Sequence, residues 1–271
     1  MNYLQIEFET MKEGESDILV ALLTEAGFES FEEKENSLLA YIKEEDFIEA
    51  VLEDILHVIP VTYARTVTPQ QNWNAQWESS FEPIMVNDFV AIRAGFHNAI
   101  QQVKYEIIIT PKMSFGTGHH ATTYMMMEQM EGIDFVNKSV VDFGTGTALL
   151  AILAEKMGAS VIDAIDNDDW SIENAGENIA TNNCFKIDIH KADTIASGKI
   201  YDIILANINL NVIQSNMQAI NAAGKKGSKL LISGFLKSDE EVLLRSFSEY
   251  GIIHHKTCQK GEWISLLAEM N

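Results

Sequence analysis

The sequence is short of cysteine, of basic side chains and of long apolar runs, and each shortage excludes a class of protein. Two cysteines, Cys184 and Cys258, are too few for a disulfide framework, so we expect reduced thiols and a cytoplasmic location. No uninterrupted apolar run approaches the roughly 18 residues that a membrane-spanning helix needs. The N-terminal stretch MNYLQIEFETMKEGES carries acids where a signal peptide is basic and then apolar. The sequence therefore predicts a protein with no membrane partner.

Basic residues are outnumbered about two to one, since 19 Lys and Arg face 40 Asp and Glu among 271 residues, for a net charge of −21. The acidic residues are concentrated at the N-terminal end. Residues 1–66 hold 16 acidic and 4 basic residues, for a net charge of −12, whereas residues 67–271 hold 24 acidic and 15 basic residues, for a net charge of −9. Direct nucleic-acid binding is disfavoured because it needs a basic footprint. A basic protein partner would be attracted, although solubility alone is the simpler explanation of the charge.

Hydrophobic periodicity divides the chain into two predicted domains and a linker. Residues 1–66 have the strand–helix–strand–strand–helix–strand pattern of a small ferredoxin-like α+β domain. This segment has no glycine-rich loop and no cluster of catalytic residue types, so we interpret it as a substrate-recognition domain. Residues 67–82 are predicted to form a linker helix, in which Trp73 and Trp77 share one face and pack on a neighbouring domain.

Residues 83–271 alternate strands and helices, which predicts an α/β domain with a mainly parallel sheet. The first two strands are expected at 84–93 and 105–110, and a closing antiparallel pair at 252–256 and 263–268. A methionine-rich helix that begins near Thr122 is expected to pack in the core.

The most informative segment of this domain is a glycine turn between two apolar strands. It reads D-x-G-x-G-x-A from Asp142 to Ala148, and the next strand ends at Asp166. Gly144 and Gly146 would let a ligand approach the backbone, and Asp166 is placed to accept hydrogen bonds from ribose hydroxyls. The dinucleotide fingerprint G-x-G-x-x-G fails, because Leu149 stands at its third glycine. The alternative is a tight strand–helix turn that binds nothing.

This pattern resembles the first motif of class I methyltransferases, which bind S-adenosylmethionine. The resemblance becomes more specific through three further segments, FGTGHHATT at 115–123, LANI at 205–208 and ISGFL at 232–236. Together with the tryptophan linker they resemble the PrmA family, the bacterial methyltransferases of the large ribosomal subunit's protein eleven. The resemblance covers essentially the whole chain and implies a class I, Rossmann-like catalytic domain behind a small substrate-binding domain.

The resemblance also implies an activity and a set of site residues. The family transfers methyl groups from S-adenosylmethionine, leaving S-adenosylhomocysteine, to the α-amine and lysine side chains of its basic ribosomal protein. Its cofactor contacts fall on four positions of this sequence: Thr123, Gly144, Asp166 and Asn207. We add three residues of the same motifs as candidate cofactor contacts: Gly118, Asp142 and Gly146. Ala148 departs from the glycine of the family motif, and we interpret it as a conservative change that tightens packing.

The chemistry of amine methylation points to Asn207 as the catalytic residue. A lysine with a pKa of about 10.4 is mostly protonated at neutral pH, so the site must favour a neutral amine and orient its lone pair. Asn207 is predicted to end the fourth strand, at the ligand edge of an open sheet; the alternative is a turn residue that caps the strand. His119 and His120 either relay a proton or simply line the loop, and no spacing indicates a metal site.

Three rival interpretations remain. Methyltransferases that act on amino groups of nucleic-acid bases often end the fourth strand with Asn-Pro-Pro-aromatic, whereas Asn207-Ile208-Asn209 contains no proline. The substrate could also be a lysine of another protein. The third alternative is a binding module with a vestigial cofactor site, against which the intact glycine turn and Asp166 argue. We expect a monomer.

Overall fold

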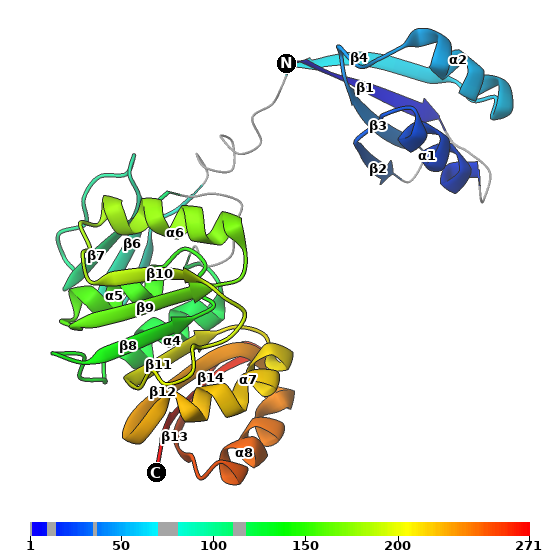
Figure 1. Ribbon diagram of the computed structural model, residues 1–271. Coiled ribbons are helices and arrows are strands. Elements are labelled where there is room, and N and C mark those ends of the chain that lie inside the picture. Colours follow the sequence, from blue (N-terminus) through cyan, green and yellow to red (C-terminus); the bar gives the residue numbers. More distant parts are fainter. Residues whose placement is uncertain (1, 10–14, 35–36, 70–80, 111–117) are drawn as a thin grey trace. The chain divides into compact units, whose positions relative to one another are not determined.

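The structure is a computed structural model of the chain, and it describes residues 2–9, 15–34, 37–69, 81–110 and 118–271. The chain divides into two compact units, Met1–Gln76 and Trp77–Asn271 (Figure 1). Within the described part of the chain, no helix is long and apolar enough to cross a membrane.

The first unit has the predicted ferredoxin-like order. Its four strands form one antiparallel sheet in the order β2-β3-β1-β4. Alternate residues of β1 face the two helices, so that Leu4, Ile6 and Phe8 are at most 4% exposed and belong to one apolar core. The elements are β1 Asn2–Glu9, α1 Glu15–Glu25, β2 Ser30–Lys34, β3 Ser37–Lys43, α2 Glu49–Val58 and β4 Tyr63–Pro69.

The end of this unit differs from the sequence prediction. Strand β4 runs to Pro69, so residues 67–69 belong to the sheet and not to the predicted linker helix. Trp73 and Trp77 lie outside the described residues.

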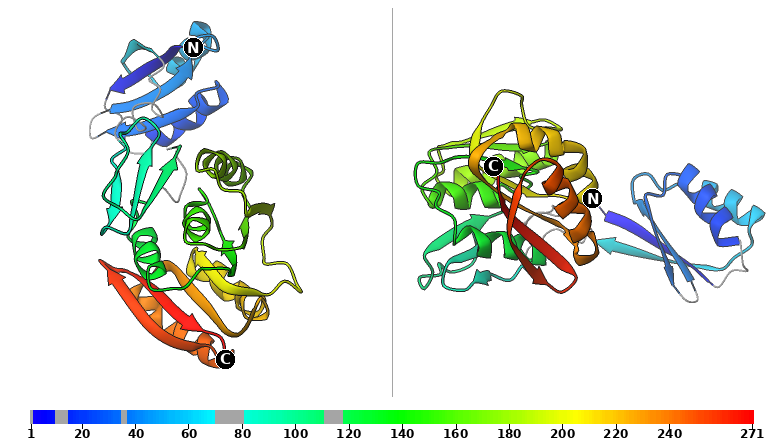
Figure 2. Two further views of the ribbon diagram at one scale, coloured as in Figure 1. Left: turned by 90° about the vertical axis from the view of Figure 1, so that its left-hand side faces the viewer. Right: turned by 90° about the horizontal axis from the view of Figure 1, so that it is seen from below.

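The second unit is built on a seven-stranded sheet in the order β10-β9-β8-β11-β12-β14-β13. Every neighbouring pair is parallel except that β14 runs antiparallel to both β12 and β13. The predicted closing pair is confirmed, and Figure 2 shows it in red at one edge of the sheet. The strands are β8 Ser139–Phe143, β9 Val161–Asp166, β10 Ile187–Lys191, β11 Tyr201–Asn207, β12 Gly224–Leu236, β13 Ile253–Lys260 and β14 Trp263–Glu269.

Helices cover both faces of this sheet, and β11 shows why its central strands are largely apolar. Ile203 and Leu205 enter the core shared with α4, α5 and α6, whereas Ile204 and Ala206 enter the core shared with α7 and α8. Four α4 methionines, expected to pack in the core, are at most 1% exposed: Met125, Met126, Met127 and Met130. The helices are α4 Ala121–Met130, α5 Leu149–Lys156, α6 Asp169–Thr181, α7 Leu210–Ala222, the 3-10 helix η1 Lys237–Asp239 and α8 Glu240–Glu249.

A separate three-stranded sheet precedes α4 and corrects the prediction of one strand over 84–93. The chain turns at Asn87, which has φ +51, and forms the antiparallel pair β5 Ile84–Val86 and β6 Val90–Ala94. Asparagine tolerates this left-handed conformation better than most residues, a turn signal that the strand assignment missed. Strand β7, Tyr105–Ile109, then pairs in parallel with β6.

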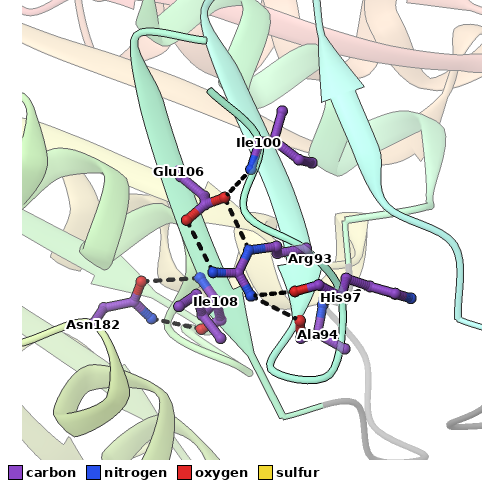
Figure 3. A network of polar contacts seen from close by, with 7 residues as sticks. All are labelled: Arg93, Ala94, His97, Ile100, Glu106, Ile108 and Asn182. Atoms are coloured by element: carbon purple, nitrogen blue, oxygen red, sulfur yellow. Dashed lines mark hydrogen bonds and ion pairs between the residues drawn. The ribbon is translucent and has the colours of Figure 1, made fainter. Parts of the chain in front are cut away.

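A partly buried ion pair joins β6 and β7 in this small sheet (Figure 3). Arg93 on β6 is 8% exposed and holds Glu106 on β7 with two hydrogen bonds, Nε to Oε1 at 2.9 Å and Nη2 to Oε2 at 3.1 Å. Its Nη1 donates to the carbonyls of Ala94 and His97, while Glu106 Oε1 accepts from the backbone of Ile100. The Arg93 hydrogen bonds lower the pKa of Glu106. The pair therefore fixes the loop between β6 and β7.

Candidate active site

A cavity of about 590 Å³ opens where β8, β9 and β11 end. From β8 the chain continues outward through β9 and β10 and then crosses back to β11 on the other side of β8, and this reversal of strand order leaves a crevice at the carboxyl edge of the sheet. The lining includes five of the seven predicted cofactor residues: Thr123, Gly144, Gly146, Asp166 and Asn207.

The glycine turn after β8 is held tightly against β9. Gly144 N and Thr145 N both donate to the carbonyl of Ile165, at 2.8 and 2.9 Å. Gly144 and Gly146 have φ of +79 and +54, a conformation that favours glycine. Ala148 also has a positive φ, +61. The interpretation of Ala148 as a conservative packing change is therefore incomplete, because a side chain here carries left-handed strain of about 1–2 kcal/mol.

Asp166 ties the end of β9 to this turn. Its Oδ2 accepts a hydrogen bond from Gly146 N at 2.9 Å, and its Oδ1 accepts from Asp168 N at 3.1 Å. The spacing of some twenty residues predicted that this acid would lie beside the glycines, and it does. Each carboxylate oxygen has a second lone pair, so the group can accept from ligand hydroxyls as well as from the turn.

Two predicted cofactor residues, Asp142 and Gly118, lie outside the cavity lining. Asp142 is 1% exposed, and its Oδ2 accepts from Thr145 Oγ1 at 2.7 Å. Burial raises its pKa to about 7, although the Thr145 hydrogen bond acts in the opposite direction. Gly118 has φ +95, and a Cβ there would lie 2.7 Å from Ile92 Cδ1. Asp142 therefore contacts the glycine turn, and Gly118 packs closely against β6.

The structure brings Asn207 and Thr123 together across 84 positions of sequence. Asn207 Nδ2 donates to Thr123 Oγ1 at 3.1 Å, and both residues line the cavity. Thr123 is positioned by the first turn of α4, where His120 is the N-cap and its Nδ1 accepts from Thr122 N at 3.4 Å. The bond to Thr123 leaves Asn207 Oδ1 as the atom of this amide that can accept a hydrogen bond from a ligand.

Sequence reasoning missed Gly234, which packs against the residue that follows Asn207. Ile208 lies between two glycines: a Cβ at Gly144 would lie 2.1 Å from Ile208 Cγ2, and a Cβ at Gly234 would lie 2.3 Å from Ile208 O. Gly234 has φ +103 and interrupts the pairing of β12 with β14. A glycine inside an apolar strand signals a bulge or a close backbone approach, and that signal was present in the ISGFL segment.

The two adjacent histidines have different surroundings. His120 lines the cavity, and its ring packs edge-on against Trp263 with centroids 4.5 Å apart. His119 packs against Phe81 instead, with centroids 4.6 Å apart, and its Nε2 lies 3.2 Å from Glu82 O. Trp263 also lines the cavity, and its position at the start of a predicted strand gave no sign of this.

One group of potential metal ligands lies elsewhere on the sheet: Asp163, Asp188 and His190. Asp163 already accepts from His190 at 3.0 Å and from Lys199 Nζ at 2.7 Å, and also bonds Tyr201 OH. Burial acts to raise the pKa of Asp163, but these hydrogen bonds outweigh it and lower the pKa. The group is therefore a hydrogen-bonded ion cluster, and none of its three members lines the cavity.

Comparison with known proteins gives the same family over nearly the whole chain. The family model for ribosomal protein L11 methyltransferase (PrmA) matches residues 5–271. A relative from Porphyromonas gingivalis, named ribosomal protein L11 methyltransferase, is 40% identical over 258 residues, which is 92% of this chain and 89% of its own. One of the same name from Bacteroides fragilis is 36% identical over 278 residues, which is 98% and 99% of the two chains.

A solved structure supports the fold. The ribosomal protein L11 methylase of Lactobacillus delbrueckii subsp. bulgaricus superposes with a TM-score of 0.66 at 25% identity, over 70% of this chain and all of its own. The strand order, the glycine turn and these matches agree, and the chain belongs to the ribosomal protein L11 methyltransferase (PrmA) family.

Proposed function

We propose that this chain transfers methyl groups from S-adenosylmethionine to amino groups of ribosomal protein L11, namely its α-amine and lysine side chains. The observation that carries the proposal is the Asn207–Thr123 hydrogen bond in the lining of a cavity that also includes Gly144, Gly146 and Asp166. The relatives are named for this substrate.

The residues present fit the methyl donor. A cavity of about 590 Å³ is of the usual size for a small-molecule site. Asp166 would hold the ribose hydroxyls, and the turn at Gly144 and Gly146 allows a close approach of ligand to backbone. When bound, S-adenosylmethionine supplies a methyl group on a sulfonium, which an amine nitrogen can attack in line.

The acceptor amine needs a free lone pair and a fixed direction. Apolar groups of Phe143, Ile208 and Trp263 line the cavity, and such surroundings favour the neutral form of an amine. Asn207 Oδ1 can accept from an N–H of that amine and so direct its lone pair into the cavity. Positioning of this kind can supply roughly 7–11 kcal/mol of the barrier, so no further covalent chemistry by the chain is needed.

We propose the first unit as the recognition domain for the basic substrate, on the basis of the net charge of −12 in residues 1–66. A shortened chain should then bind S-adenosylmethionine normally but lose methylation of L11. It should begin at Trp77 and not at the predicted boundary of 83, because Phe81 is 4% exposed in the core of the second unit. Full methylation of L11 by the folded fragment would contradict the recognition role.

The proposed function itself is tested by calorimetry with S-adenosylmethionine and by transfer of a radiolabelled methyl group to purified L11, with ribosomal RNA as the competing acceptor. We expect label in the protein and none in the RNA. Absence of cofactor binding, or label in the RNA alone, would contradict the proposal. A monomer and a cytoplasmic location remain predictions, and size-exclusion chromatography tests the first.

A further inference from the structure

Asn178 on α6 and Asn182, the C-cap residue of that helix, supply hydrogen bonds to the outer edge of β7. Asn182 accepts from Ile108 N at 3.0 Å and donates to Ile108 O at 2.6 Å (Figure 3). One turn earlier, Asn178 accepts from Thr110 N at 2.8 Å. β7 pairs with β6 along its other edge, so these side chains take the place of a further strand.

Asn178 has a second contact that Asn182 lacks. Its Nδ2 donates to the carbonyl of Thr147 at 3.0 Å, and Thr147 lines the cavity within the glycine turn. Asn178 is fully buried, at 0% exposure. The side-chain amide of Asn182 donates instead to the carbonyls of Ile108 and Asn178.

The carbonyl that Asn178 holds belongs to the peptide between Thr147 and Ala148. Rotation of this peptide changes the φ of Ala148, which is +61 and therefore strained for alanine. Strained backbone persists only where surrounding contacts fix it. The N–H of the same peptide is held as well, because Ala148 N donates to Thr145 O at 2.9 Å. If the bond to Thr147 O is lost, one of these two contacts is gone, and the strain at Ala148 then favours rotation of the peptide and a change in the shape of the turn that lines the cavity.

We propose that Asn178 is a positioning residue that keeps the glycine turn in its cofactor-binding conformation, and that Ala148 makes this chain depend on it. Where glycine occupies position 148, the left-handed conformation carries little strain and the turn needs less support. The inference rests on the proposed function in one respect, that the cavity binds S-adenosylmethionine and its product.

The experiment compares Asn178→Ala with Asn182→Ala in the full chain, by calorimetric titration with S-adenosylhomocysteine. Both variants lose a buried amide and part of the β7 edge, so both should unfold at a lower temperature. Only Asn178→Ala should also weaken binding, with about a ten-fold rise in Kd, as expected for loss of one buried hydrogen bond. Equal Kd changes in the two variants would overturn the inference and leave Asn178 a purely structural residue.

The same comparison in an Ala148→Gly background tests whether the strain at Ala148 makes the turn depend on Asn178. There the effect of Asn178→Ala on Kd should shrink to a few-fold or less, whereas an undiminished ten-fold effect would overturn the proposed dependence on Ala148. If Asn178→Ala does not fold, the pair Asn178→Ser and Asn182→Ser is compared by the same criterion. A wild-type chain that does not bind S-adenosylhomocysteine would refute the proposed function, and this inference with it. Binding by the wild type with an unchanged Kd in Asn178→Ala would refute this inference alone.

Discussion

Replacing Gly234 with alanine should slow methyl transfer by moving the backbone next to Asn207. The added Cβ would lie 2.3 Å from Ile208 O, 2.6 Å from Ile208 C and 2.9 Å from Ile208 N. Ordinary contact begins at 3.4 Å, so the Ile208 peptide must shift by about 1 Å, and a misplacement of that size can cost about 100-fold in rate. We therefore expect single-turnover methyl transfer to fall between about 10-fold and 100-fold.

The chain offers a matched control for this substitution. Gly227 lies on the same strand with φ +86, and a Cβ there would meet nothing within 4 Å. Gly227→Ala should therefore share the backbone strain, about 1–3 kcal/mol, but not the collision. Both variants should unfold at lower temperature, by about 2–4 °C for each kcal/mol in a domain of this size.

The assay is single-turnover transfer to L11 at saturating S-adenosylmethionine, with the unfolding temperature measured alongside. Only Gly234→Ala should be slow, because only its collision reaches the peptide that follows Asn207. If the two variants transfer methyl groups at the same rate, the close approach of Gly234 to Ile208 does not position Asn207, and the reasoning fails.

Three further predictions concern the carboxylates and the amide of the site. Asp166→Ala should weaken S-adenosylmethionine binding by ten-fold or more, because charge-assisted hydrogen bonds are worth roughly 1.5–3 kcal/mol each; unchanged calorimetric affinity with a normal circular dichroism spectrum would refute its role. Asn207→Ala should reduce the single-turnover rate more than cofactor affinity, since its amide should act on the acceptor amine in the transition state; equal losses would make it a binding residue only. Burial raises the pKa of Asp142 to about 7, above roughly 3.9 in an unfolded chain, so the folded state holds the proton more tightly and its stability falls as pH rises from about 4 to 7. Asp142→Asn should remove this fall. The unfolding temperature of the variant should therefore rise relative to that of the wild type between pH 5.5 and pH 7, and the difference should persist at pH 8.5. A difference in unfolding temperature that does not change with pH would contradict the raised pKa of Asp142.

The sequence alone determined most of the helices and strands and the ligand edge of the sheet, although it missed the turn at Asn87 and the end of β4. Largely apolar runs such as 201–207 are typical of strands covered on both faces, and β11 is covered in this way. The glycine turn and Asp166 could be placed together because one strand–helix–strand unit brings its two strand ends side by side. These are local patterns, and they depend on periodicity and turn chemistry more than on distant contacts.

Only the tertiary structure decided which side chains meet in the cavity. Asn207 contacts Thr123 across 84 positions, and Trp263 at the start of β14 packs against His120. The family resemblance marked Thr123 and Asn207 as cofactor residues, but residue patterns gave no signal for either contact, because each joins segments that only the strand order and the packing of α4 bring together. Asp142 gives a second example. The motif predicted it as a cofactor residue, but it is buried and does not belong to the cavity lining. A motif specifies which residues are close in sequence, whereas packing decides which of their atoms face the ligand.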